Sequence, residues 1–408
     1  MKKLLSILLS ILLVSTLVFT ATACNDSSES ESIDETVTPV TVTVESTKED
    51  GTDVNTLTEI SLSAAAKTYV DNKEFDKLAA LFTAHNIKGF TIDAANATVK
   101  YEIPAEVTHI ATNAITNLTF ITDLVVGSKV VEIEKGAFVG LSGLKSITLP
   151  FVGSKIGAIN GAKLFAYIFG SIGGEGLTAV TQTYNEGTES TEALYVPTSL
   201  KTVTITGTVE ANETSISYYI TEDNKQVPVE EGTTAGPNNE TVYTRKTLDY
   251  STSAVQPYAF HSITTIETVN LPEGTKIIPE YAFYGCTGIK ALSFGDDVVI
   301  GKYAYANCTS LRDLTLGAVT INEGAFSGCS YLGKDSEVDF GGIDVSKVKE
   351  FGKDSFAGCT SLTKENLVKV ELSDNATEEE INAYEEYLAK LVEAFGEEFF
   401  EEDEDDNN

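Results

Sequence analysis

The chain has 408 residues, a formal net charge of −33, no tryptophan and only three histidines. A surface this acidic excludes nucleic acid and anionic membranes as binding partners, because both require a basic protein surface. Side chains that exchange protons near neutral pH are few, since histidine is the residue best suited to that task.

The first 24 residues, MKKLLSILLSILLVSTLVFTATAC, are typical of an export signal, with two lysines, a long apolar run and small residues at the end. We predict that residues 1–23 are a signal peptide. The small residues before Cys24 resemble a bacterial lipobox, although Ala21 stands where that pattern usually has leucine. Lipidation of Cys24 would anchor the protein at the bacterial cell surface through its acyl chains alone. Cleavage without lipidation, which would give a secreted protein, is the alternative.

Residues 24–55 are rich in serine, threonine and acidic side chains, so we predict a flexible tether after the lipidated cysteine. Four valines leave an edge strand as the alternative there: Val37, Val40, Val42 and Val44. Residues 56–104 are predicted to form an N-terminal helical cap with helices at Ser61–Val70 and Lys73–His85. The second helix has an apolar stripe made of Phe75, Leu78, Ala79 and Phe82.

A repeated motif fills residues 105–372 and follows a period of 21 to 23 residues, apart from one spacing of 30. Each unit has a column position, mostly aromatic, preceded by a small residue and followed by the pattern L-x-x-L-x-L. The column residues are Ile115, Phe138, Phe260, Phe283, Tyr305, Phe326 and Phe356. This period lies in the leucine-rich-repeat range, where each unit buries its apolar edge against its neighbours. We therefore predict a repeat solenoid, α/β to mainly β, built as a curved stack of short parallel strands.

Four cysteines stand three residues after a column position: Cys286, Cys308, Cys329 and Cys359. Earlier units have Leu118, Leu141 and Ile263 at the same place, so we predict that the cysteines are core residues. No C-x-x-C or Cys/His pair supports a metal site. Disulfides are permitted outside the cell, but stacked columns need not offer the required geometry. A catalytic thiol needs a low pKa, which an apolar column does not provide.

The stretches IPEYAFYGC, INEGAFSGC and LRDLTL resemble the BspA-like leucine-rich-repeat surface proteins of bacteria. The segment between Leu149 and Thr206 also looks like a piece found in many of these proteins. The resemblance covers residues 105–370. It implies a curved solenoid on the bacterial surface and adhesion to ligands of a host or of a neighbouring cell. It implies no catalytic residue, because members lack a shared catalytic motif.

Two insertions interrupt the repeats, at residues 151–194 and 206–254. The first contains the apolar sequence LFAYIFG, which we expect to pack on the flank of the solenoid, and the second should form a β-hairpin or two. Residues 373–408 should form a C-terminal amphipathic helix that caps the last unit, followed by an acidic tail. The helix begins near Thr377, and its apolar positions are Ile381, Tyr384, Leu388, Leu391 and Phe395. We interpret the tail as a solvated charge run rather than a calcium site.

The residues between the leucines of each L-x-x-L-x-L should point outward and form a candidate binding face. They are Lys145, Ser146, Thr148, Lys201, Thr202, Thr204, Glu267, Thr268, Asn270, Lys290, Ser293, Arg312, Asp313 and Thr315. We predict that this face binds an extracellular protein or glycan ligand, such as host matrix or a neighbouring cell. A sheet face that is merely solvated would have the same composition.

Two other functions compete with binding. The protein could be a structural spacer of the cell envelope without a specific ligand, or a hydrolase whose site lies in an insertion. No G-x-S-x-G, H-E-x-x-H, P-loop or Rossmann fingerprint is present, and tryptophan, the usual platform for sugars, is missing. We therefore predict a binding protein that is not an enzyme and uses no metal or cofactor.

Overall fold

The computed structural model describes residues 37–45, 54–84, 89–185, 190–221, 225–230, 233–237, 241–334, 343–362 and 377–396. The chain divides into two compact units, Met1–Glu35 and Thr36–Asn408, and the described residues all belong to the second. The predicted signal peptide, Cys24 and the acidic tail lie outside the described residues.

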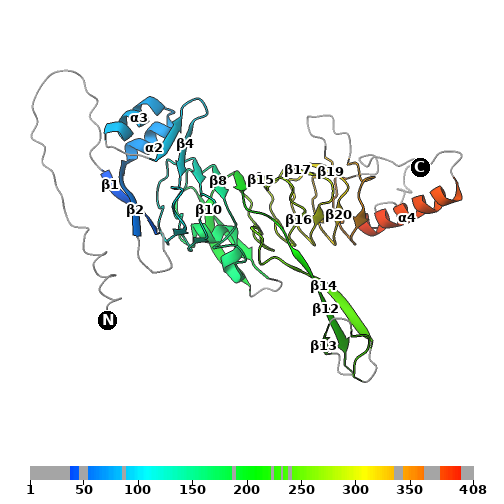
Figure 1. Ribbon diagram of the computed structural model, residues 1–408. Coiled ribbons are helices and arrows are strands. Elements are labelled where there is room, and N and C mark those ends of the chain that lie inside the picture. Colours follow the sequence, from blue (N-terminus) through cyan, green and yellow to red (C-terminus); the bar gives the residue numbers. More distant parts are fainter. Residues whose placement is uncertain are drawn as a thin grey trace, which may run out of the picture. The chain divides into compact units, whose positions relative to one another are not determined.

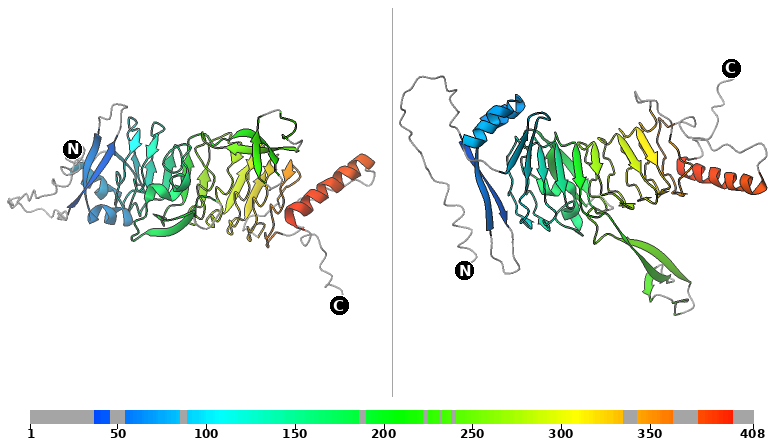
Figure 2. Two further views of the ribbon diagram at one scale, coloured as in Figure 1. Left: turned by 90° about the horizontal axis from the view of Figure 1, so that it is seen from below. Right: turned by 45° about the horizontal axis from the view of Figure 1, so that its top comes forward.

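Short strands from successive units pair side by side in the repeat region (Figures 1 and 2). One sheet has the order β15-β11-β8-β6-β4-β3, and all its pairs except β3 with β4 are parallel. Its strands are β3 (Phe90–Asp93), β4 (Thr98–Glu102), β6 (Asp123–Val125), β8 (Ser146–Leu149), β11 (Thr202–Ile205) and β15 (Thr268–Asn270). Within β8, half-exposed Ser146 and Thr148 alternate with buried Ile147 and Leu149, as a strand with one face on the core requires.

Other strands of the repeats form three smaller parallel sheets. β17 (Ala291–Phe294) pairs with β19 (Asp313–Leu316), and β5 (His109–Ile110) pairs with β7 (Glu132–Ile133). The third has the order β16-β18-β20-β21, with strands β16 (Ile277–Ile278), β18 (Val299–Ile300), β20 (Thr320–Ile321) and β21 (Glu350–Phe351). Each unit therefore adds strands that hydrogen-bond to the equivalent strands of a neighbouring unit.

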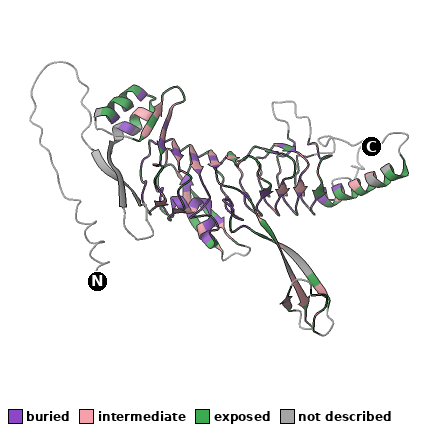
Figure 3. Ribbon diagram, viewed as in Figure 1, coloured by how far each residue is buried: buried purple, intermediate pink, exposed green. Residues whose placement is uncertain are grey.

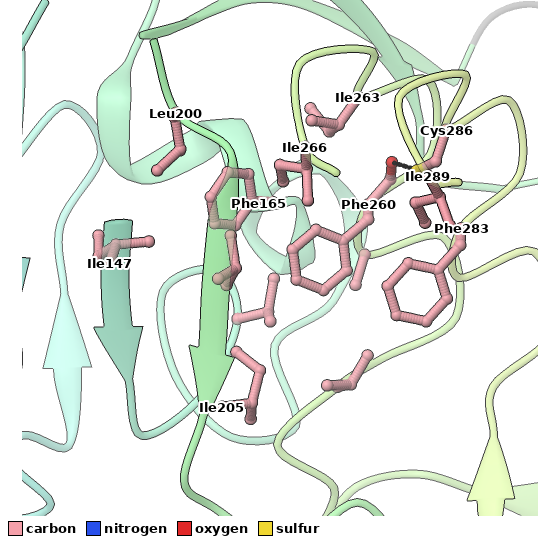
Figure 4. Packing of buried hydrophobic residues seen from close by; sticks show 14 of the residues in the cluster. Ile147, Phe165, Leu200, Ile205, Phe260, Ile263, Ile266, Phe283, Cys286 and Ile289 are labelled. Atoms are coloured by element: carbon pink, nitrogen blue, oxygen red, sulfur yellow. Dashed lines mark hydrogen bonds between the residues drawn. The ribbon is translucent and has the colours of Figure 1, made fainter. Parts of the chain in front are cut away.

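A column of stacked aromatic rings occupies the core between these strands. Ring centroids are 5.0 Å apart between Phe260 and Phe283 and 4.9 Å apart between Phe283 and Tyr305. The column continues through Phe326 and Phe356 at 5.8 and 5.3 Å, with every pair within 15° of parallel. Figure 4 shows the rings of Phe260 and Phe283 as neighbours in the core, and their planes are nearly parallel. Because adjacent strands lie about 4.8 Å apart, the ring spacing matches the spacing of the backbone ladder.

Each unit turns around its column residue with left-handed backbone two positions before and two positions after it. The residues two positions before the seven column residues are Asn113, Gly136, Tyr258, Tyr281, Tyr303, Gly324 and Asp354. Tyrosine is unfavourable in this conformation, whereas glycine and asparagine tolerate it. The rings of Tyr258 and Tyr281 stack at 4.7 Å, and the ring of Tyr303 packs against Tyr281 at 5.2 Å with a tilt of 31°. This contact offsets part of the backbone strain.

The first insertion contributes to the aromatic core, and our expectation that LFAYIFG packs on the flank is wrong. Its elements are η1 (Asn160–Lys163), η2 (Phe165–Phe169), β9 (Leu177–Thr183) and β10 (Thr191–Pro197). The amide of Phe138 donates to the carbonyl of Ile168, and the amide of Phe165 donates to the carbonyl of Ala259. The rings of Phe165 and Phe260 stack at 4.9 Å. The apolar segment thus stands in for a repeat unit between Phe138 and Phe260.

The second insertion forms an antiparallel sheet of three strands, β12 (Asn212–Ile220), β13 (Gln226–Val229) and β14 (Val242–Asp249). This agrees with the expected hairpins. Several large apolar side chains in the insertion remain exposed, among them Ile220, Tyr243 and Leu248. Figure 3 shows little buried surface along these strands, in contrast with the repeats.

The N-terminal region differs from its prediction in three ways. Residues 37–45, assigned to the tether, form β1 (Val37–Glu45), which pairs with β2 (Val54–Ser63), so the edge-strand alternative applies. Helix α2 (Ala64–Asp71) begins later than predicted, because the preceding serines pair with β1. In α3 (Phe75–Ala84), Leu81 is buried in place of the expected Ala79.

The C-terminal helix α4 (Glu378–Phe395) contacts the last repeat through its final turns only. Phe395 stacks on Phe356 at 4.7 Å, and the amide of Phe356 donates to the carbonyl of Ala394. Ile381 and Leu388 are exposed, so the predicted apolar stripe is not buried along its whole length. The reason is that the aromatic column ends at Phe395 and offers no surface to the earlier turns.

The column makes a direct prediction for stability. We expect Phe283→Ala to lower the free energy of unfolding by about 3–5 kcal/mol, because it removes a fully buried ring that stacks on both sides. Exposed Thr315 serves as the control, and Thr315→Ala should change the same quantity by less than about 0.5 kcal/mol. Guanidinium unfolding followed by circular dichroism measures both. Equal unfolding midpoints for the two variants would contradict the column.

Candidate ligand-binding face

The predicted face consists of side chains that point outward from β8, β11, β15, β17 and β19. Eight of the predicted residues are exposed, namely Lys145, Lys201, Thr268, Asn270, Lys290, Ser293, Arg312 and Thr315. The other six are half-buried, namely Ser146, Thr148, Thr202, Thr204, Glu267 and Asp313. All are therefore accessible to a ligand to some extent, and none belongs to the buried core.

The face is polar and partly held by contacts between neighbouring strands. Asn270 donates from Nδ2 to Thr204 Oγ1 at 3.1 Å, and Ser146 hydrogen-bonds with Asp123. Such cross-strand pairs fix the side chains of the N-terminal sheet in register. The threonines at this surface are therefore presented in a defined arrangement.

Two of the basic residues are engaged with one carboxylate. Lys290 Nζ donates to Glu267 Oε2 at 2.8 Å, and Lys201 Nζ lies 3.4 Å from Glu267 Oε1. The hydrogen bond from Lys290, together with the charges of both lysines, holds the pKa of Glu267 below its ordinary value. All three side chains face solvent, so the pairs add at most about 1 kcal/mol each. An acidic ligand group would have to compete with Glu267 for these lysines.

The strand ladder of the face is interrupted between β15 and β17. Parallel pairing joins β8, β11 and β15, and separately β17 and β19, but residues 241–334, which are described throughout, contain no pairing of β15 with β17. The predicted stack of short parallel strands is therefore interrupted at this junction. Behind the break, Phe260 and Phe283 still stack at 5.0 Å, so the units separate only on the strand side.

A cleft of about 650 Å³ occupies the break. Its walls are Glu267–Leu271 from the β15 side and Ala291–Gly295 from the β17 side, and its floor reaches core residues Ile278, Phe283 and Tyr305. A second hollow of about 590 Å³ lies near the N-terminal helices and includes Lys73 and Lys145. The cleft in the strand face is thus the hollow most directly continuous with the predicted binding residues.

The residues that set this cleft apart from the rest of the strand face are not among the predicted outward-pointing residues. Val269, Leu271 and Leu292 are inward positions, yet they are only half-buried, whereas Ile147, Val203 and Leu314 at equivalent positions are buried. One signal in the sequence was Phe294, an aromatic residue where other units have Leu149, Ile205, Leu271 or Leu316. Its ring packs edge-on against Tyr305 and Phe326, both in later units. The aromatic side chain therefore fills space on one side of β17 and leaves the other side open.

The cysteine column lies in the core and has a structural role. Cys286, Cys308, Cys329 and Cys359 are all free and buried. Each thiol donates to the backbone carbonyl of a column aromatic in the preceding unit, as Cys308 does to Phe283 at 3.3 Å. Figure 4 shows the corresponding bond from Cys286 to Phe260. Burial raises the pKa of Cys308 to about 12, which is opposite to the shift that a reactive thiol needs.

Other side chains that could take part in catalysis or metal binding also have structural roles or lie outside the described residues. Burial lowers the pKa of His261 to about 4, so this residue is neutral at pH 7, and its ring stacks on Tyr284 at 4.8 Å. His85 lies outside the described residues. The described part of the chain contains no group of three His, Cys, Asp or Glu side chains placed to hold a metal ion. Nor does any helix within it have the length and hydropathy to cross a membrane.

The chain belongs to the BspA-type leucine-rich-repeat family. Six copies of the BspA type leucine rich repeat region match residues 55–166 and 239–363, more than half of the sequence. The resemblance read from the repeat motifs is thereby confirmed. The protein is accordingly a leucine-rich-repeat protein with many short strands.

Comparison with individual proteins adds two distant similarities. No curated protein matches the chain significantly. A leucine-rich repeat protein from Bacteroides ovatus is 16% identical over 67% of this chain and 68% of its own, with a TM-score of 0.27. Another from Eubacterium ventriosum is 16% identical over 68% of this chain and 67% of its own, with a TM-score of 0.22.

The raised thiol pKa predicts how stability depends on pH. A folded-state pKa of about 12 exceeds the ordinary value of 9.0, so Cys308 stabilises the fold fully below pH 9 and loses this contribution as pH rises toward 12. Between pH 8 and pH 10 the wild type should therefore lose roughly 1 kcal/mol more stability than Cys308→Ala. Urea unfolding at both pH values measures the difference. Parallel losses in the two proteins would show that the Cys308 thiol is not buried in solution.

Proposed function

We infer that this chain is a surface-anchored binding protein without enzymatic activity that holds an extracellular protein or glycan through its strand face. The observation that carries this inference is the series of outward side chains on β8, β11 and β15, which are accessible and placed in register by parallel pairing. A rigid sheet presents such groups at low entropic cost, because their backbone is already ordered.

The supporting features agree with a scaffold for binding rather than catalysis. The four cysteines at residues 286–359 are used in the core, His261 is half-buried and stacks on Tyr284, and the family is one of leucine-rich repeats. Repeat proteins use extended surfaces built from equivalent positions of successive units to bind their partners. We assign a capping role to α2 and α3 at one end and to the last turns of α4 at the other, because a repeat stack must cover its terminal core.

Anchoring is tested at Cys24. If this residue carries acyl chains, Cys24→Ala should move the protein from the membrane fraction to the culture medium, because the lipid is its only strong membrane contact. Cell fractionation followed by immunoblotting measures the distribution. Cys359→Ala, which removes a buried cysteine, is the matched control and should remain in the membrane fraction. Unchanged fractionation of Cys24→Ala would contradict lipidation.

Binding through the strand face is tested by charge reversal. We expect the double variant Lys145→Glu/Arg312→Glu to lose at least tenfold in capture of its ligand on an array of glycans and matrix proteins. Both residues are exposed, so the melting temperature should change by less than about 2 °C.

The matched control for this test reverses two exposed lysines outside the strand face, Lys155→Glu/Lys353→Glu. It has the same net charge as the face variant and should retain capture. Equal capture by both folded variants would remove the strand face as the binding site. Absence of any ligand for the wild type on the array would favour the envelope-spacer hypothesis.

A further inference from the structure

The break between β15 and β17 leaves two strand edges facing each other across the cleft. We propose that this cleft binds an extended segment of a partner protein, which adds to both edges as one further parallel strand. The proposal rests on the proposed function and specifies it, since it names the part of the strand face that holds the partner and the conformation that the partner adopts. Addition of a peptide strand to a sheet edge is an established mode of recognition.

The directions of the backbone N–H and C=O groups on both edges can be inferred from the alternation seen where neighbouring strands are paired. The amide of Val126, an inward residue of its unit, donates to the carbonyl of Thr148, an outward residue of the next one. At another intact junction, the amide of Gly317, an outward position, donates to the carbonyl of Phe294, an inward residue of the preceding unit. Inward residues therefore direct their N–H and C=O groups toward the following strand, and outward residues direct theirs toward the preceding strand.

Applied to the break, this rule identifies the unpaired groups. The inward residues Val269 and Leu271 direct backbone groups into the cleft from β15, and the outward residues Ala291 and Ser293 do so from β17. Within the fully described stretch 241–334, no hydrogen bond joins the backbone of these four residues across the cleft. An unpaired strand edge favours pairing with another chain.

The cleft offers an apolar floor to the inward side chains of an added strand and a polar rim to its outward side chains. Ile278, Phe283, Ile289 and Val298 line the floor, so they would cover the inward side chains of the added strand. The half-buried Leu271 and Leu292 would become buried like their equivalents in other units. The outward side chains of the added strand would lie beside the polar residues of the face. The occupant is therefore a segment in which apolar and polar residues alternate.

Tyr305 provides a polar group at the same place. It is the tyrosine of a column that otherwise consists of phenylalanine from residue 260 to residue 356, and it lines the cleft while only 3% exposed. The backbone or a side chain of an added strand can form a hydrogen bond with its hydroxyl, which both donates and accepts.

A protein segment suits the cleft better than a glycan does. The unsatisfied groups are regularly spaced backbone donors and acceptors on two parallel edges, and the floor is aliphatic and aromatic. Stacked column rings present no free face for a sugar, because Phe283 and Tyr305 cover each other at 4.9 Å. A polypeptide in the β conformation satisfies both edges with its own backbone.

The test uses a peptide that already occupies a ladder position in this protein. The fluorescent peptide SLKTVTIT copies residues 199–206, which include β11, and its binding to the mature chain is measured by fluorescence anisotropy. We expect saturable binding. The same peptide N-methylated at its central valine lacks one ladder donor and should bind at least about tenfold more weakly, which corresponds to 1.4 kcal/mol.

Two variants of Ser293 locate the interaction on the protein. Ser293→Pro removes an edge N–H and should weaken peptide binding at least about tenfold, whereas Ser293→Ala keeps the N–H and should bind within about twofold of the wild type. Circular dichroism and the unfolding midpoint check that both variants fold. If Ser293→Pro does not fold, the N-methylated peptide tests the same backbone bond without any change to the protein.

Several results would overturn the proposal. The first two are that the peptide does not bind, or that the N-methylated peptide binds as tightly as the unmodified one. The other two are that Ser293→Ala weakens binding as much as Ser293→Pro does, or that a glycan which Ser293→Pro still binds displaces the peptide. If the peptide does not bind but the wild type captures its ligand on the array normally, only the proposal for the cleft is contradicted. If the peptide binds but the array test fails, the proposed binding role of the strand face is contradicted and the proposal for the cleft stands.

Discussion

The spacing of the stacked aromatic rings is the constraint on which the other parts of this structure depend. Rings in contact prefer separations of about 5 Å in an offset stack, and strands in a parallel ladder lie at nearly the same distance. The column from Phe260 to Phe395 meets both conditions, so one repeat length satisfies side chains and backbone together. The left-handed turns, the buried thiols and the outward strand residues all follow from keeping each unit in this register.

The same constraint explains how the strand face can open while the stack remains intact. Phe260 and Phe283 belong to the two units that flank the cleft, and their rings are 5.0 Å apart. On the turn side, the amide of Phe260 donates to the carbonyl of Ala282. The units are therefore held together behind the cleft by ring stacking and turn hydrogen bonds. An added strand would use groups that the stack itself leaves unpaired.

Much of the repeat architecture could be predicted from the sequence, because periodicity reports which residues share a core position. The column residues, the outward positions and the burial of the cysteines depend on this local pattern, and the pattern also led to the confirmed family. The role of LFAYIFG could not be predicted, since its residues follow no repeat and only the spatial gap between Phe138 and Phe260 gives them a place in the column. The strand at residues 37–45 could be predicted from its valines only as an alternative to the tether, because its pairing with β2 is not a local property of the sequence.

The cleft shows a different limit. A repeat motif predicts which residues point inward but not whether two neighbouring strands are close enough to bond. That distance depends on the size of side chains such as Phe294 and on the connection between strands. Leu271 is seven positions before Ile278, whereas Phe294 is six positions before Ile300 and Leu316 five before Ile321. The pair β17–β19 stays intact across the same difference of one residue, so this spacing alone does not predict the break.

Hydrogen exchange of backbone amides, resolved residue by residue in the folded protein, tests the interrupted ladder most directly. Amides in intact ladders exchange slowly because the sheet must open first. The amide of Asp313 bonds to the carbonyl of Lys290, so it should be protected, whereas the amides of Ala291 and Ser293 should exchange at least about 100-fold faster. Equal protection at these three positions would mean that β15 and β17 are paired in solution, and it would contradict an open cleft between the two strands.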